Sequence, residues 1–269
     1  MKENELMLTS LLDCERIDLA VKARELTPEQ ERQFRQMKAR RAQGEPVQYI
    51  IGKTDFMGIA LAVDRRALIP RPETEILVEL AVSNGKALRQ DGKLNVLDLG
   101  TGSGNIAIAM AENISHAQIT AVDVSAEALT LAKMNAKTRG VHGRIRFIGE
   151  DMSVYLKATS AEARKFNIII SNPPYIPTEE LARLPADVRN EPRTALDGGH
   201  DGLHFYREIL KYAYTVLSPD GLLALEIGDG QRNSIEKIFA QYPQYQRVEF
   251  FKDYVQTDRI VMARLSETF

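Results

Sequence analysis

Four consecutive residues in the second half of the chain can hold a planar NH2 group. They are Asn172-Pro173-Pro174-Tyr175, directly after an apolar run. The Asn172 side-chain oxygen and the Pro173 carbonyl can both accept from one NH2 group, and the two prolines restrict the backbone that carries them. Tyr175 can stack on a flat amide or base, although a plain turn with a core tyrosine is the alternative. The tetrad predicts chemistry on an amide or aromatic-amine nitrogen, a weak nucleophile that depends on placement.

A glycine-rich turn follows the apolar run 94–99. It reads Asp98-Leu99-Gly100-Thr101-Gly102-Ser103-Gly104. Glycines permit a tight turn and let a ligand approach backbone N–H groups without meeting a Cβ. Because ligands of open α/β sheets sit beyond the carboxyl ends of the strands, this turn predicts a nucleotide-like ligand.

Two cofactors compete for the turn. Gly102-x-Gly104-x-x-Ala107 fits a loose dinucleotide fingerprint, which leaves an NAD-dependent oxidoreductase open. The longer pattern from Asp98, with alternate glycines, resembles the first motif of class I S-adenosylmethionine-dependent methyltransferases. The physical difference is charge: a pyrophosphate prefers N–H groups without an adjacent carboxylate, whereas an ammonium or a sulfonium favours one.

Acidic residues follow the next two apolar runs. Asp123 ends the second run, where a carboxylate can accept from two ribose hydroxyls of either cofactor. Asp151 follows the third run and can accept from an adenine amino group, while Met152 offers a polarizable contact to the ring. The alternative for this pair is a turn cap and a core methionine. Together these residues predict an adenosine-containing ligand.

Alternating apolar runs and helical segments predict the elements that position these groups. Strands are expected near 94–99, 118–122, 144–148, 166–171, 221–227, 246–251 and 259–265. Helices are expected near 104–113, 125–138, 202–217 and 230–242. The alternation predicts right-handed crossovers and a Rossmann-like α/β fold, with a mostly parallel seven-stranded sheet covered on both faces. The short connection between the last two strands predicts that one of them runs antiparallel.

The first 75 residues have a different character. Residues 1 to about 50 read as helical, with a capping box at Thr27 and Gln30 and a core face that includes Phe34 and Met37. Apolar residues between 47 and 63 suit short strands in a hairpin-like connector, and 71–75 opens a further helix. We therefore expect a small N-terminal helical domain (1–52), a β-hairpin linker (53–75) and a catalytic domain (76–269).

Composition narrows the function. The 269 residues carry 35 Lys+Arg against 37 Asp+Glu, and this near-neutral charge disfavours a general electrostatic grip on DNA or RNA. A single cysteine, Cys14, excludes an internal disulfide framework and a multi-cysteine zinc site. The four histidines show no ligand spacing, so no metal is expected. No run approaches the ~20 apolar residues that span a bilayer, and we expect a cytoplasmic protein without a membrane partner.

Several segments together resemble the bacterial PrmC/HemK family. They are Gly44-Glu45-Pro46-x-Gln48-Tyr49-Ile50-x-Gly52, Leu68-Ile69-Pro70-Arg71-Pro72-Glu73-Thr74-Glu75, Asn172-Pro173-Pro174-Tyr175-Ile176, Glu191-Pro192-x-x-Ala195-Leu196-x-Gly198-Gly199-x-Asp201-Gly202-Leu203 and Asp258-Arg259-Ile260-Val261. That family uses S-adenosyl-L-methionine to methylate the side-chain amide of the glutamine in the Gly-Gly-Gln motif of peptide chain release factors. The resemblance covers the chain from about Leu11 onward.

The resemblance implies a division of labour. The N-terminal helical region would bind the release factor, and the C-terminal domain would bind the cofactor and catalyse. Cofactor binding is expected at Asp98, Gly100, Thr101, Gly102, Ser103, Gly104, Asp123, Asp151, Met152 and Asn172. Catalysis and substrate binding are expected at Asn172, Pro173, Pro174 and Tyr175, with Arg71 and Glu191 as further substrate-binding residues. We expect a monomer with no direct nucleic-acid substrate.

Other functions stay open on the sequence alone. A DNA or RNA amino-methyltransferase uses the same tetrad, but the near-neutral charge and the lack of an obvious target-recognition domain argue against it. A release-factor binder without catalysis is a third class. Arg71 can belong to a plain helix start, Glu191 lies in a long segment suited to covering a substrate, and Glu226 is open between a structural and a catalytic role.

Overall fold

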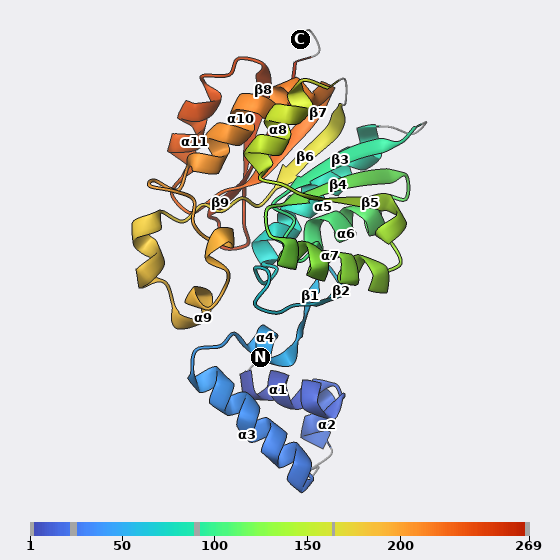
Figure 1. Ribbon diagram of the computed structural model, residues 1–269, viewed down its shortest axis with the longest axis vertical. Helices are drawn as coiled ribbons and strands as arrows, with labels where there is room; N and C mark the ends of the chain where they lie inside the picture. The colour runs from blue at the N-terminus through green and yellow to red at the C-terminus, as the bar shows by residue number, and fades with distance from the viewer. Residues whose placement is uncertain (1–2, 22–25, 89–91, 163–164, 267–269) are drawn as a thin grey trace.

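The computed structural model describes residues 3–21, 26–88, 92–162 and 165–266. Figure 1 shows a small helical bundle at one end, a two-stranded hairpin above it, and a large sheet flanked by helices. Within the described residues, no helix combines the length and the apolar character that crossing a membrane requires.

Four helices form the N-terminal bundle. They are α1 (Glu3–Leu12), α2 (Arg16–Val21), α3 (Pro28–Ala42) and α4 (Val47–Ile51). The predicted capping box at the start of α3 is confirmed: Gln30 N–H donates to Thr27 Oγ1, and Thr27 N–H donates to the Gln30 side chain. Phe34 and Met37, which were predicted to face a small core, pack against the buried cluster of Met7, Val47 and Ile50. The part of the helical prediction that covers 1–2 and 22–25 lies outside the described residues.

The strand expected over residues 47–51 is wrong, because this segment is helix α4. Pro46 occupies its N-cap, and Gly52 ends it at φ 80°, donating its N–H to Gln48 O at 2.7 Å. Helical geometry turns Val47 toward the bundle core, while Tyr49 packs into a separate cluster with the linker. A five-residue segment with four apolar residues is too short for its period to separate a helix from a strand.

The predicted hairpin consists of β1 (Lys53–Phe56) and β2 (Ile59–Ala62), which pair antiparallel. Their apolar side chains, including Phe56 and Leu61, join the core of the large sheet. The Asn135 side chain on α7 (Ala126–Thr138) accepts from Ala62 N at 2.9 Å and donates to Ala62 O at 3.0 Å. These contacts attach the linker to the domain that contains the large sheet.

The sheet has seven strands in the order β5-β4-β3-β6-β7-β9-β8. The strands are β3 (Leu94–Leu99), β4 (Ala117–Asp123), β5 (Ile145–Gly149), β6 (Phe166–Ser171), β7 (Leu217–Glu226), β8 (Tyr245–Lys252) and β9 (Asp258–Leu265). All seven were predicted, and β9 runs antiparallel to both neighbours, as expected for one of the last two. The strand order reverses between β3 and β6, so their carboxyl ends form a topological switch point, where ligands of such sheets bind.

Helices cover both faces (Figure 1). Helices α5 (Pro72–Leu88), α6 (Asn105–Asn113) and α7 (Ala126–Thr138) pack on one face, and α8 (Met152–Ser160), α10 (His204–Val216) and α11 (Arg232–Phe239) on the other. The helix α8 was not predicted. The long connection between β6 and α10 contains η2 (Thr178–Arg183), the short helix α9 (Ala186–Arg189) and η3 (Arg193–Ala195).

Candidate functional site

The glycine turn lies at the carboxyl end of β3. Gly100, Gly102 and Gly104 all have positive φ, at 73°, 54° and 84°. The Gly100 and Thr101 N–H groups both donate to Val122 O, at 2.9 and 3.0 Å, which holds the turn against β4. A Cβ on Gly100 would lie 3.3 Å from Met152 Cε and 4.0 Å from Asn172 O. The turn therefore brings the predicted residues after β3, β5 and β6 together.

A fully buried carboxylate stands behind this turn. Asp98 Oδ2 accepts from Thr101 Oγ1 at 2.6 Å, while Oδ1 has no hydrogen-bond partner within the described ranges. Burial raises the pKa of Asp98 to about 7. An acidic group placed beneath backbone amides is unsuited to a pyrophosphate and compatible with a cationic ligand.

Asp123 ends β4 beside the turn. Its Oδ2 accepts from Gly102 N at 2.8 Å and its Oδ1 from Ser125 N at 2.8 Å. Burial raises the pKa of this carboxyl, and the two backbone N–H groups lower it. The side chain thus fixes the glycine turn and presents its carboxylate to the adjacent cavity.

A cavity opens at these strand ends. Six of the predicted residues line it: Gly100, Gly102, Asp123, Asp151, Met152 and Pro174. The other predicted residues do not: Arg71, Asp98, Thr101, Ser103, Gly104, Asn172, Pro173, Tyr175 and Glu191. Asp151 also caps α8, where it accepts from Ser153 N at 2.9 Å. The side chain therefore serves as a cap, as in one interpretation, and also lines the cavity, as the ligand-binding interpretation requires. Sequence reasoning missed the linker residues Arg66, Ala67 and Leu68, and the wall formed by Pro192, Thr194, Ala195 and Phe205. Two resemblance motifs overlap these segments and were the available signal.

The tetrad follows β6 directly, and the β6 end is tied to β3 by a 2.6 Å bond from Ser171 Oγ to Leu99 O. Asn172 Nδ2 donates to Thr74 Oγ1 at 3.0 Å. Its Oδ1 and the Pro173 carbonyl receive no hydrogen bond from the residues that the structure describes. Both oxygens are therefore available as acceptors for an incoming NH2 group.

A glycine-containing loop supports the tetrad from behind. The Ile176 N–H donates to Leu196 O at 3.0 Å, and the Gly198 N–H donates to Ile176 O at 2.8 Å. Gln231 Nε2 donates to Tyr175 O at 3.0 Å. The segment after the tetrad thus returns to it and fixes its backbone. Gln231 contributes to the same support, and no pattern in the sequence indicated this role.

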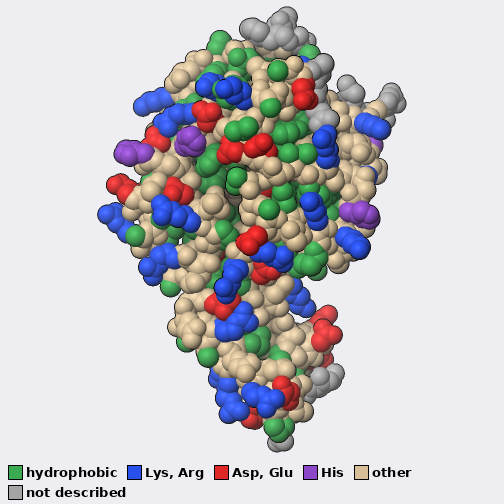
Figure 2. All heavy atoms as spheres, viewed as in Figure 1, with side chains coloured by type: hydrophobic (Ala, Val, Ile, Leu, Met, Phe, Trp, Pro, Cys, Tyr) green, Lys and Arg blue, Asp and Glu red, His purple; other side chains and the backbone are tan. Residues whose placement is uncertain are grey.

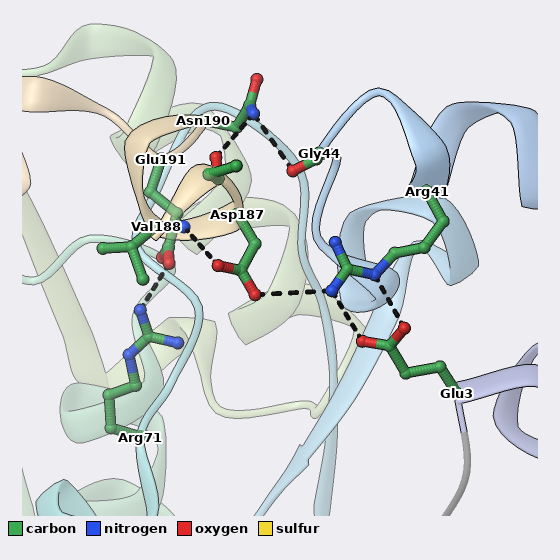
Figure 3. Close-up of polar contacts among 9 residues, drawn as sticks. Glu3, Arg41, Gly44, Arg71, Asp187, Val188, Asn190 and Glu191 are labelled. Carbon is green, nitrogen blue, oxygen red and sulfur yellow. Dashed lines mark hydrogen bonds and ion pairs between the residues drawn. The ribbon is translucent and has the colours of Figure 1, made fainter. Parts of the chain in front are cut away.

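Arg71 and Glu191, which were expected to bind substrate, form an ion pair (Figure 3). Glu191 is buried, and its second carboxylate oxygen accepts from Ile69 N at 2.9 Å. Burial raises the pKa of the Glu191 carboxyl, and Arg71 lowers it. Both oxygens are engaged inside the protein, so this pair fastens the long loop to the linker.

The same loop also reaches the N-terminal bundle (Figure 3). Asn190 Nδ2 donates to Gly44 O at 3.1 Å, and Arg41 lies 3.7 Å from Asp187 while it pairs with Glu3 at 2.8 Å. One connection therefore contacts the bundle, the linker and the tetrad.

Two parts of the chain match known families. Residues 2–52 match the PrmC N-terminal domain, and residues 74–185 match the methyltransferase small domain. Two solved structures share the fold. A SAM-dependent methyltransferase from Agrobacterium tumefaciens has a TM-score of 0.56 and 17% identity, covering 80% of this chain and 70% of that one. A methyltransferase from Pyrococcus furiosus has a TM-score of 0.55 and 19% identity, covering 88% and 98%.

Curated relatives are similar over most of their length. A release factor glutamine methyltransferase from Thermodesulfovibrio yellowstonii is 36% identical over 269 residues, which is 100% of this chain and 94% of the relative. One from Moorella thermoacetica is 40% identical over 89% of this chain and 82% of its own. One from Chlorobaculum tepidum is 41% identical over 95% and 87%.

Proposed function

Because the chain belongs to the release factor glutamine methyltransferase (PrmC/HemK) family, we propose that it methylates the side-chain amide of the glutamine in the Gly-Gly-Gln motif of a peptide chain release factor. The supporting observation is the Asn172 amide, anchored through its nitrogen at the strand switch point with its oxygen available. The family excludes the oxidoreductase alternative that the glycine turn left open.

The residues around the cavity suit S-adenosylmethionine, the cofactor of this family. Gly100 and Gly102 give close backbone approach, and a Cβ there would stand in the way. Asp123 offers carboxylate oxygens for ribose hydroxyls, and Met152 offers an apolar, polarizable wall for adenine. The buried Asp98, whose pKa is raised to about 7, supplies negative charge near the turn in its ionised form, which a neighbouring cation favours. When bound, the cofactor supplies an electrophilic methyl group on a sulfonium.

The chain's own residues then have to place the substrate nitrogen. We propose that Asn172 Oδ1 and the Pro173 carbonyl accept from the glutamine NH2 group, turning its nitrogen toward the methyl carbon. Pro174 keeps this corner rigid, and Tyr175 covers the flat amide. As the new N–C bond forms, the bond from that methyl carbon to the sulfonium sulfur would break and leave a neutral thioether, and the nitrogen releases a proton to water. Such positioning can supply up to about 7–11 kcal/mol of the barrier reduction.

We propose indirect roles for Arg71 and Glu191. Their ion pair holds the long loop whose other residues, Pro192 to Ala195, wall the cavity. We further propose that residues 1–52 contact the release factor, that 53–75 link the two parts, and that 76–269 catalyse. The bond between Asn190 and Gly44 joins the first and third of these parts.

We propose that the protein acts as a monomer in the cytoplasm, where release factors are made and used, and that it has no direct nucleic-acid substrate. On the face shown in Figure 2, basic and acidic side chains are interspersed. A formal net charge of -2 gives no general attraction to a phosphate backbone.

Mass spectrometry of a release factor incubated with the protein and S-adenosylmethionine tests this function. We expect one added methyl group on the glutamine of the Gly-Gly-Gln motif, seen as a mass increase of about 14 Da, which corresponds to one CH2 unit. A release factor with that glutamine replaced by alanine should gain none. A methyl group added to this variant, or methylation that is lost when the reaction is treated with nuclease, would contradict the proposal.

Asp123 supports a further prediction. D123A removes the proposed ribose acceptors and the bond to Gly102, so the Kd for S-adenosylhomocysteine should rise about 10- to 100-fold, as for the loss of a charged hydrogen-bond partner. Isothermal titration measures this change. E127A, on the first turn of α7, is the control and should bind normally. Equal affinities of D123A and wild type for S-adenosylhomocysteine would show that Asp123 does not contribute to cofactor binding.

A further inference from the structure

A chain of hydrogen bonds continues from Asn172 into the protein interior. Asn172 Nδ2 donates to Thr74 Oγ1 at 3.0 Å, and Thr74 Oγ1 donates to Glu226 Oε2 at 2.5 Å. Thr74 and Glu226 are each 1% exposed. The three residues come from the end of β6, the first turn of α5 and the end of β7. None of the functions assigned so far uses Thr74 or Glu226.

The polarity of this chain decides which way the Asn172 amide faces. An ionised carboxylate only accepts, so the Thr74 hydroxyl must give its single proton to Glu226. The hydroxyl can then only accept from Asn172, which requires the NH2 end of the amide. The oxygen end is thereby left for the substrate. We propose that Thr74 and Glu226 are positioning residues that fix the Asn172 amide with Oδ1 as the acceptor for the glutamine NH2 group.

Glu226 also holds the other side chain of the tetrad. Tyr175 OH donates to Glu226 Oε1 at 3.3 Å. Tyr206 OH donates to the backbone carbonyl of Glu226 at 2.9 Å, which anchors the end of β7. One buried carboxylate therefore orients both Asn172, through Thr74, and the Tyr175 ring. This inference rests on the proposed function, because it assigns a role in the same methyl transfer.

Burial of a carboxylate is costly, which argues against a merely structural role for Glu226. An apolar residue would fill the same place in the core without the desolvation penalty. Burial, with a smaller contribution from the nearby Glu73, raises the pKa of Glu226 to about 7. Bonds from Thr74 and Tyr175 and the charge of Arg259 lower it. Perturbed carboxylates of this kind concentrate at functional sites.

Protonation of Glu226 has a defined consequence. A protonated carboxyl can donate to Thr74, which then can donate to Asn172 and turn the amide around. Because the pKa is raised, the accepting form predominates above about pH 7 and is lost as the pH falls through that value. The charged and titratable side chains around Glu226 are Glu73 on α5, Arg259 on β9, Tyr175 after β6 and Tyr206 on α10. We expect kcat to fall on the acid side.

The kinetic test measures kcat for methylation of a release factor and compares Thr74 variants of the full chain with the wild-type protein. T74V removes the hydroxyl at nearly constant volume and should lower kcat about 10- to 100-fold, since small misplacements cost this much. T74S keeps the hydroxyl and should stay within about 3-fold of wild type. T159V, a valine at an equally buried threonine on α8, is the matched control and should leave kcat unchanged. The Kd for S-adenosylhomocysteine should be the same in all four proteins.

Glu226 gives an independent comparison if T74V does not fold. E226Q should lower kcat to a similar extent and flatten the acid limb of the pH profile. When T74V does fold, the double variant T74V/E226Q should be no slower than the slower single variant, because both substitutions break the same chain of hydrogen bonds. Wild-type kcat in T74V or E226Q, or a loss in T74S equal to that in T74V, would overturn the proposal.

A substrate-independent measurement separates this inference from the proposed function. The side-chain NH2 of Asn172, assigned by its absence in N172D, should exchange with solvent about 10-fold more slowly in wild type than in T74V. Exchange should be unchanged in T159V. Equal exchange rates in wild type and T74V would overturn the positioning role, whether or not the protein methylates a release factor.

Discussion

Replacing Asn172 by alanine is expected to lower kcat for release factor methylation by about 10²- to 10³-fold, the effect of losing one preorganised hydrogen-bonding group at a reacting centre. The variant lacks the Oδ1 acceptor and the bond to Thr74, so only the Pro173 carbonyl remains to orient the glutamine. The fold should survive, because Asn172 is only partly buried. Single-turnover transfer of a labelled methyl group at saturating cofactor measures the loss.

The control is N113A, at the end of α6. Asn113 donates to Ala109 O within its own helix and does not line the cavity, so its removal should not change the rate. A different outcome would assign Asn172 to cofactor binding alone: N172A would bind S-adenosylhomocysteine weakly and recover the wild-type rate at saturating cofactor. A rate loss at saturation supports the acceptor role.

The parts of the fold that the sequence predicted well are those coded locally. The strand β3 and the glycine turn are contiguous, and their apolar run and three glycines directly determine a buried strand and left-handed turn positions. The tetrad likewise follows β6 without a break. The prediction for helix α4 failed because its five residues, four of them apolar, are too few to show a period. Its conformation depends on Pro46, Gly52 and burial against two cores.

The connections behind the site could not be predicted, because they join distant residues. Thr74 and Glu226 are 152 positions apart, and neither position has a pattern that specifies its partner. Arg71 and Glu191 were each expected to bind substrate, and only the structure shows that they bind each other across 120 positions. Such pairs form only when folding brings segments that are distant in the sequence together.

Replacing Gly202 by alanine is expected to reduce both stability and activity. Gly202 has φ 73°, and a Cβ there would lie 2.3 Å from Tyr175 O and 2.8 Å from Gln231 Nε2. The left-handed conformation costs an alanine about 1–2 kcal/mol, and the overlap with backbone should bring the loss in free energy of unfolding to about 3 kcal/mol or more. Denaturant unfolding measures it. Because Tyr175 must move, kcat should fall about 10- to 100-fold even in the folded fraction.

Gly140 separates the two causes of this effect. It has nearly the same φ, 72°, yet a Cβ there would meet nothing within 4 Å. G140A should therefore cost only the backbone term, about 1–2 kcal/mol, and leave kcat unchanged. If G202A and G140A lose equal stability and G202A keeps its kcat, the loop after the tetrad yields without moving Tyr175. A loss of kcat confined to G202A would instead mean that the close approach of this loop holds the substrate-orienting corner in place.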